Sequence, residues 1–212
     1  MSSSMKRRTA EQVLDAIRKA VWEQFIESGY ASITFAGIAR RSGVVKPVLY
    51  RRYSDRATMV YDAILSSSEK FEIPAPTGSL RSDLIVWYTR AESRVSAVGL
   101  ASYRGLIGEA NDQILEMIRK SSRTIAQKIS THVIEPARQR GELGPLPLDA
   151  ETIYTPSRLM RDRAVFEGEL VDIPAFVDAI VLPLFRGASG WVPEASDGRA
   201  PKGAAARRGR QS

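Results

Sequence analysis

The segment from Thr34 to Tyr53, TFAGIARRSGVVKPVLYRRY, constrains the fold of this chain more than any other part of it. Gly43 divides the segment. Because glycine takes a left-handed backbone conformation cheaply, it ends one helix and turns the chain into the next. The second helix can bury Val44, Leu49 and Tyr53 and present basic and aromatic residues on its other side. These are Lys46, Pro47, Tyr50, Arg51 and Arg52. The spacing predicts a helix-turn-helix whose second helix suits a DNA major groove.

The same residues resemble the DNA-binding signature of the TetR family of transcriptional regulators. The matching positions are Thr34, Ile38-Ala39, Gly43-Val44, Lys46-Pro47, Leu49-Tyr50 and Tyr53, followed by Ser54-Asp55-Arg56. The resemblance is close over residues 9–70 and extends beyond them only to the general all-helical plan of the family. It implies an all-α fold, in which a three-helix DNA-binding domain is joined through a fourth helix to a helical ligand-binding and dimerisation domain.

A recognition helix needs hydrogen-bond donors for base edges and positive charge for phosphates. Lys46 is placed to donate to guanine, and Val48 to contact a thymine methyl group. Val45 stands where the family usually has a serine-like helix cap, so one hydroxyl contact to phosphate is missing. The residues, with the family roles at matching positions, predict this set of DNA contacts: Thr34, Lys46, Pro47, Val48, Tyr50, Arg51, Arg52 and Arg56.

The net charge of +7 is distributed unevenly along the 212 residues. Residues 1–56 carry eleven Lys and Arg against five Asp and Glu, a net charge of +6, and residues 197–212 carry +4, which leaves −3 between them. A basic head on a mildly acidic body is typical of a polyanion-binding domain joined to a regulatory domain. A solubilising surface charge is the alternative, and the motif inside the basic head favours DNA binding.

Apolar periodicity predicts helices throughout the chain. Four are expected in the head, over residues 9–28, 34–42 and 46–53 and after a Ser54 cap. Prolines at 74 and 76 interrupt the pattern, and further helices are expected over 80–95, 103–140 with a break near Asn111, 149–167 and 174–186. The expected domains are a flexible basic arm (1–8), the DNA-binding domain (9–70), the effector-binding and dimerisation domain (71–192) and a disordered basic tail (193–212).

The second domain offers candidates for a ligand site and for a subunit interface. Aromatic residues and methionines on its helices suit an amphipathic organic effector, although such stripes are more often core. They are Trp87, Tyr88, Tyr103, Met117, Tyr154 and Met160, and Glu92, Glu109 and Arg158 could add specificity. The last helix is apolar on almost every side, which indicates an interface or burial in one subunit's core. The interface candidates are Phe176, Ile180, Val181, Leu184 and Phe185.

Several classes of function are disfavoured. The chain has no cysteine and a single histidine, His132, and it contains neither HExxH nor a glycine-rich phosphate loop, so neither an enzyme, a metal site nor a cofactor is expected. A start without an apolar run indicates a cytoplasmic protein, and no membrane association is expected. We therefore predict a homodimeric, ligand-responsive repressor that binds a palindromic double-stranded DNA operator and an unidentified small organic effector. An activator or architectural DNA-binding protein without an effector is the alternative.

Overall fold

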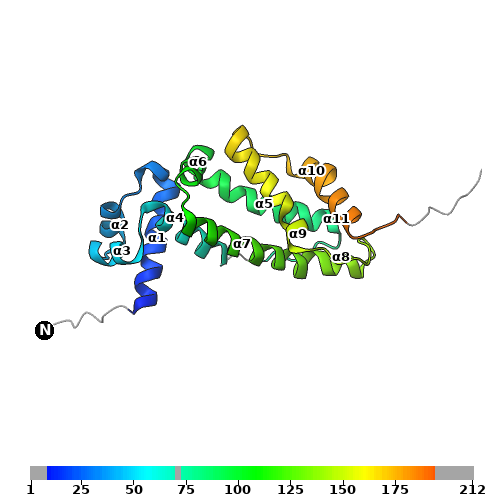
Figure 1. Cartoon of the computed structure of the whole chain (residues 1–212), viewed down its shortest axis with the longest axis horizontal. Coiled ribbons are helices and arrows are strands. Elements are labelled where there is room, and N and C mark those ends of the chain that lie inside the picture. The colour runs from blue at the N-terminus through cyan, green and yellow to red at the C-terminus, as the bar shows by residue number, and fades with distance from the viewer. Residues whose placement is uncertain (1–8, 70–72, 194–212) are drawn as a thin grey trace, which may run out of the picture.

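The computed structural model describes residues 9–69 and 73–193, and within these ranges every regular element is a helix (Figure 1). The all-α fold class is confirmed. The expectations for the arm at 1–8 and for the tail from 194 onward lie outside the described residues. The head comprises α1 (Ala10–Ser28), a short 3-10 turn (Tyr30–Ser32), α2 (Phe35–Ser42), α3 (Lys46–Arg52) and α4 (Arg56–Glu69).

The body is an elongated bundle that extends from one side of the head (Figure 1). Its α-helices are α5 (Leu80–Val98), α6 (Leu100–Gly108), α7 (Asp112–Ile129), α8 (Glu135–Gln139), α9 (Ala150–Asp162), α10 (Ile173–Phe176) and α11 (Leu182–Ala188). Three π-helical stretches, Ser130–Ile134, Arg163–Glu167 and Val177–Val181, continue α7, α9 and α10. None of the described helices has both the length and the apolar character needed to cross a membrane.

Local side-chain chemistry sets most helix boundaries of the head. Thr9 and Gln12 form a capping box at the start of α1. The Thr34 hydroxyl accepts from the Gly37 amide at the start of α2, and Gly43 ends that helix with φ 66° and ψ 22°. The cap of α4 differs from the expectation. Asp55 accepts from the Thr58 amide, so the aspartate replaces the predicted Ser54 because its carboxylate reaches the third residue beyond it.

Two of the π-helical stretches lie just before prolines inside continuous helices. The Glu135 amide donates to the Ser130 carbonyl, and the Leu182 amide to the Val177 carbonyl, five residues back in each case. The next residue is Pro136 in the first helix and Pro183 in the second. Proline has no amide hydrogen and crowds the carbonyl four residues earlier, so a locally wider turn lets the helix continue through it.

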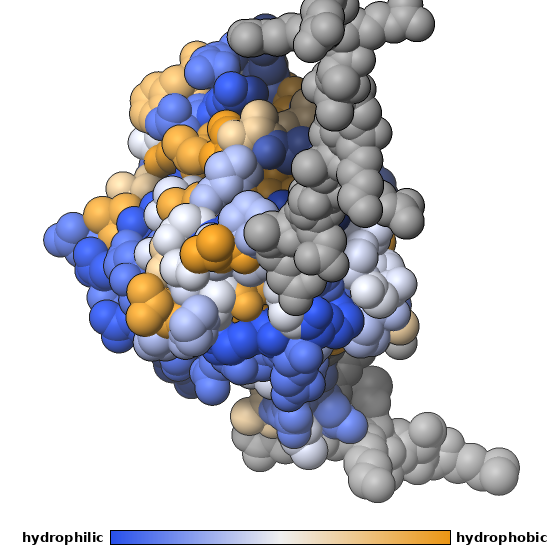
Figure 2. Space-filling view, turned by 90° about the vertical axis from the view of Figure 1, so that its right-hand side faces the viewer, coloured by the Kyte–Doolittle hydropathy of each residue, from blue (hydrophilic) through white to orange (hydrophobic). Residues whose placement is uncertain are grey.

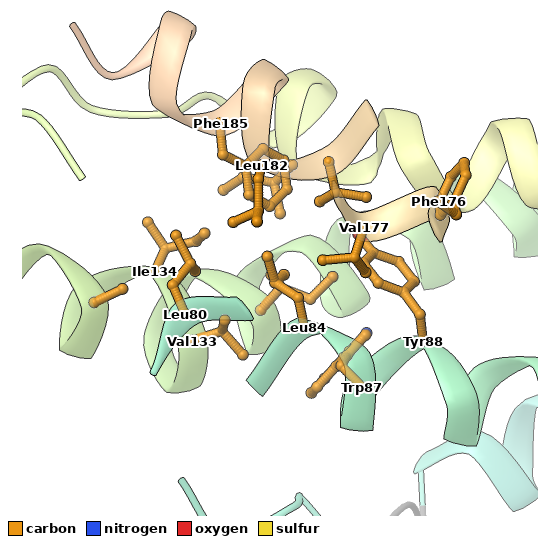
Figure 3. Close-up of a cluster of buried hydrophobic side chains, with 14 of the residues drawn as sticks. Leu80, Leu84, Trp87, Tyr88, Val133, Ile134, Phe176, Val177, Leu182 and Phe185 are labelled. Atoms are coloured by element: carbon orange, nitrogen blue, oxygen red, sulfur yellow. The ribbon is translucent and has the colours of Figure 1, made fainter. Parts of the chain in front are cut away.

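The buried apolar side chains form two clusters. One belongs to the head but also includes Leu106 of α6 and Ile114 of α7. The other fills the body, where Leu80 and Leu84 of α5 face Phe185 and Leu182 of α11 (Figure 3). The head core therefore continues into the near end of the body, which ties the two parts together by shared burial.

The burial of the last helices corrects part of the prediction that they form a subunit interface. Phe176, Val181 and Phe185 are 4%, 0% and 0% exposed within a single chain, so their side chains are not available to a second subunit in this structure. They pack on α5 instead, because an all-round apolar helix was also compatible with burial in one subunit. Ile180 and Leu184 are only partly buried and remain at the edge of the body core.

Asp62 joins three elements of the head. Its carboxylate accepts from the Arg18 guanidinium of α1 at 2.9 and 2.7 Å and from the Tyr53 hydroxyl, just after α3, at 2.6 Å. Burial by itself raises the pKa of Asp62, but the hydrogen bonds from Arg18 and Tyr53 outweigh it and hold the pKa below its ordinary value. The recognition helix is thus anchored to α1 and α4 through one carboxylate.

The Asp62→Asn substitution should lower the free energy of unfolding by about 1–3 kcal/mol, because the partly buried Arg18 loses its charged acceptor. Urea unfolding measures this, and the exposed Asp162→Asn is the control. A carboxylate with a lowered pKa stabilises the fold above its ordinary pKa of about 3.9 and loses that contribution as the pH falls below it. The variant should therefore lose less stability than the parent protein over that acidic range. Equal losses of stability in the Asp62→Asn variant and the parent protein over that pH range would contradict this role of Asp62.

Candidate nucleic-acid interface and ligand cavity

Helix α3 presents its outer face to solvent. Lys46, Pro47, Tyr50, Arg51 and Arg52 are all exposed, as is Thr34 at the start of α2. Val45 makes no side-chain cap at the start of α3, in line with its departure from the family pattern, and Pro47 removes one amide that would need a partner. Lys46, Arg51 and Arg52 make this exposed face positively charged.

Two residues of the predicted DNA-contacting set are held by the protein itself. Tyr50 is 61% exposed, yet its ring stacks on Phe35 of α2, with centroids 4.4 Å apart and planes 9° from parallel. Val48 is half-buried and packs against the head core, which reduces the apolar surface that it can offer to a base. Both contacts fix the orientation of α3 relative to α2 and the rest of the head.

The structure turns Arg56 toward the body. Its guanidinium makes a two-pronged ion pair with Glu109 at the end of α6, with Nε donating to Oε2 at 3.1 Å. The Tyr30 hydroxyl donates to the same carboxylate at 2.7 Å, and the guanidinium lies 4.7 Å from the centre of the Tyr30 ring. The hydrogen bonds from Arg56, then those from Tyr30, hold the pKa of Glu109 below its ordinary value. Here Arg56 acts as a bridge between head and body.

A second contact lies beside this bridge. The side-chain Nδ2 of Asn111 donates to Asp55 at 2.8 Å, while the side-chain Oδ1 of Asn111 caps α7 by accepting from the backbone amide of Ile114. The break between α6 and α7 thus faces the start of α4. Sequence spacing gave no sign of these pairs, because their members are more than fifty residues apart in the chain.

The body contains a cavity of about 260 Å³. Its walls come from α4, α5, α6, α7, α9 and the segment after α9. Apolar and aromatic residues form most of the lining, with a few charged groups: Tyr61, Ile64, Leu65, Trp87, Ala91, Glu92, Arg94, Val95, Tyr103, Leu106, Ile118, Ser121, Ile125, Lys128, Tyr154, Ser157, Met160, Arg161, Ala164, Leu170 and Val171. Such a lining suits an amphipathic small molecule.

Four of the six residues predicted for an effector site line this cavity: Trp87, Tyr103, Tyr154 and Met160. Tyr88 does not, because the next residue along a helix points about 100° away from Trp87. Its ring is fully buried against Phe176, edge-on with centroids 6.1 Å apart. Met117 packs instead against the head core.

Sequence reasoning missed several cavity residues. Tyr61, Ile64 and Leu65 belong to α4, whose apolar stripe the sequence assigned to the DNA-binding domain. Arg94, Lys128 and Arg161 were not singled out, since a lone basic residue on a helix usually faces solvent. Of the polar residues that were considered, Glu92 lines the cavity, whereas Glu109 binds Arg56 and Arg158 pairs with Glu151.

Comparison with known proteins agrees with this geometry. Residues 17–62 match the family model described as "Bacterial regulatory proteins, tetR family". The chain is 29% identical over 138 residues to the HTH-type transcriptional regulator AqdR of Rhodococcus erythropolis, an alignment that covers 64% of each chain. The head of this chain therefore matches the DNA-binding domain of the TetR family, and the chain is similar to transcriptional regulators of that family. The family resemblance and the helix-turn-helix are thereby confirmed, and the expectation of a regulator rather than an enzyme agrees with these relatives.

The matches to two further proteins cover nearly the whole length of those proteins. The regulator is 25% identical over 193 residues to the uncharacterized HTH-type transcriptional regulator YdeS of Bacillus subtilis strain 168, which covers 88% of this chain and 95% of YdeS. The crystal structure of the TetR family transcription regulator SCO0332 has a TM-score of 0.63 and 24% identity, over 85% of this chain and 98% of that one. This second likeness shows a shared fold for head and body together.

Two substitutions in α3 should separate base reading from phosphate binding. Arg51→Ala should weaken binding of this regulator to all DNA sequences alike, whereas Lys46→Ala should also relax the preference at one base pair, at a cost of about 1–3 kcal/mol there. Arg52 is less suitable because its charge also acts on Tyr53 and Asp62 within the head. Binding to a library of single-base operator variants measures both effects. Sequence-independent losses in both variants would remove Lys46 from base reading.

Removing the charge of Glu109 should loosen the contact between head and body. In Glu109→Gln, both Arg56 and Tyr30 lose a charged acceptor, so amide hydrogen exchange over residues 29–33 and 100–109 should accelerate about fivefold. Glu116→Gln is the matched control, since the ion pair of Glu116 with Arg119 lies within α7. Unchanged exchange in the Glu109 variant, or equal acceleration in both, would show that the bridge contributes little.

Proposed function

We propose that this protein is a repressor that binds a palindromic operator as a homodimer and leaves it when a small molecule fills the body cavity. The observation that carries the proposal is the position of α4. Residues 57–61 of this helix are all buried, and Tyr61, Ile64 and Leu65 farther along it line the cavity. A ligand that displaces these side chains therefore displaces α4, which packs against α1 of the head.

The displacement needed for release is small. Two recognition helices of a dimer must fit successive major grooves on the order of 34 Å apart, so a shift of a few ångströms prevents simultaneous docking. The Asp62 contacts and the bridge at Glu109 transmit movement because they fix α3 to α4 and α4 to α6. The ligand then shifts the equilibrium only as far as it prefers the released state.

We place the dimer contact on the outer side of α9 and α11, which pack beside each other. Leu159 and Phe166 are 40% and 77% exposed on α9 and its π-helical continuation, and Ile180 and Leu184 are only partly buried. Figure 2 shows the end of the body, where apolar side chains form separate patches among hydrophilic ones. An interface that includes this region is therefore mixed in polarity.

The alternative, an activator or architectural protein without an effector, requires no cavity next to α4. The largely apolar cavity at that position favours the ligand-responsive function.

Selection from random double-stranded DNA tests the proposal. The protein should enrich an inverted repeat whose half-sites are centred about one helical turn apart, and light scattering of the complex should give two chains per operator. Placed over a promoter, this site should lower transcription. Enrichment of a single half-site bound by one chain, or no enrichment, would exclude the dimeric repressor. Raised transcription from the same site would favour an activator.

A further inference from the structure

The charged residues that line the cavity are predominantly basic. Arg94, Lys128 and Arg161 come from three different helices, α5, α7 and α9, whereas Glu92 is the only carboxylate among the lining residues. An excess of basic groups on a largely apolar wall attracts a negatively charged ligand. The excess of basic over acidic side chains favours an anionic amphipathic ligand over a cationic one.

Arg161 differs from its neighbours on the same helix. Arg158 pairs with Glu151 at 2.6 Å and Arg163 with Glu167 at 3.9 Å, whereas Arg161 forms no ion pair with any carboxylate in the part of the chain described. Its contacts are with Tyr154, whose ring centre lies 5.9 Å from the guanidinium and whose hydroxyl lies 3.4 Å from Nη1. A guanidinium without a carboxylate partner at a cavity wall can bind an anion.

Besides Tyr154, two other tyrosines, Tyr61 and Tyr103, line the same cavity as this cation. Burial raises the pKa values of Tyr61 and Tyr103, and the charge of Arg161 acts on both in the opposite direction, which places the three groups within electrostatic reach of one another. Neutral tyrosines can donate hydrogen bonds to the same anion that the guanidinium attracts. The polar end of the cavity therefore combines a fixed positive charge with neutral donors.

Glu92 supplies one acidic group against these basic ones. Its Oε1 atom is buried without a hydrogen-bond partner among the described residues, and burial raises the pKa of its carboxyl group. The three basic side chains of the lining outnumber this single carboxyl group. The remaining wall, with Trp87, Ile125 and Met160, is apolar.

We propose that the cavity binds a small amphipathic organic anion, with its carboxylate on Arg161 and the neighbouring tyrosines and its apolar body along Trp87, Ile125 and Met160. A volume of about 260 Å³ lies just below the usual range for drug-sized ligands, so the ligand is a small one. This inference rests on the proposed function and specifies the class of effector that would operate it.

Three probes of matched length test the charge preference: octanoate, octanamide and octylammonium. Calorimetric titration of the full-length protein at pH 7 should show octanoate binding about tenfold or more tighter than octanamide, since hydrogen bonds to charged groups are the stronger ones. Octylammonium should bind weakest. Comparable affinities for octanoate and octanamide, tightest binding of octylammonium, or no binding of any probe would overturn the proposal.

Variants locate the anion site. Arg161→Gln should weaken octanoate binding about tenfold or more while leaving octanamide binding within about twofold. Arg163→Gln is the matched control and should change neither, because Arg163 does not line the cavity. If Arg161→Gln fails to fold, as seen by circular dichroism, Lys128→Gln supports the same comparison. Equal losses for both probes would show a structural role for these cations. The titrations contain no DNA, so their failure and a failure of operator selection are separate results.

Discussion

The rest of the structure depends on the burial of α4. Residues 57–61 are buried on every side of the helix, so its first half is surrounded by α1, the turn after α3 and the near end of the body. The second half contributes side chains to the cavity. Because close-packed interiors transmit small displacements rather than absorb them, a helix enclosed in this way moves as a unit with whatever touches it.

Two polar contacts also fix the elements that pack around α4. Asp62 holds α3 and α1 against α4, and Glu109 holds the start of α4 through Arg56. The ion pair between Arg56 and Glu109 is partly exposed, so its contribution is modest and depends on salt. Its value lies in position, because it joins the end of α6, which borders the cavity through Tyr103 and Leu106, to the head.

The head was largely predictable from sequence because its determinants are local. Thr9 with Gln12, Thr34, and Gly43 each set a boundary through contacts within four residues or through their own backbone preference. The order of the body helices also followed from apolar periodicity. The sites were less predictable. Trp87 and Tyr88 are adjacent and chemically similar, yet one lines the cavity and the other is buried against Phe176.

By itself the sequence determined the all-α class, the helix-turn-helix, the resemblance to the TetR family and the basic face of the recognition helix, since these depend on short-range spacing and on composition. Only the tertiary structure decided that Arg56 binds Glu109, that Phe185 belongs to one chain's core, and that Arg161 lies at a cavity wall without a carboxylate partner among the described residues. The physical reason is common to all three. Each depends on which helix faces meet across long sequence separations, and periodicity identifies a buried face without naming the residue that covers it.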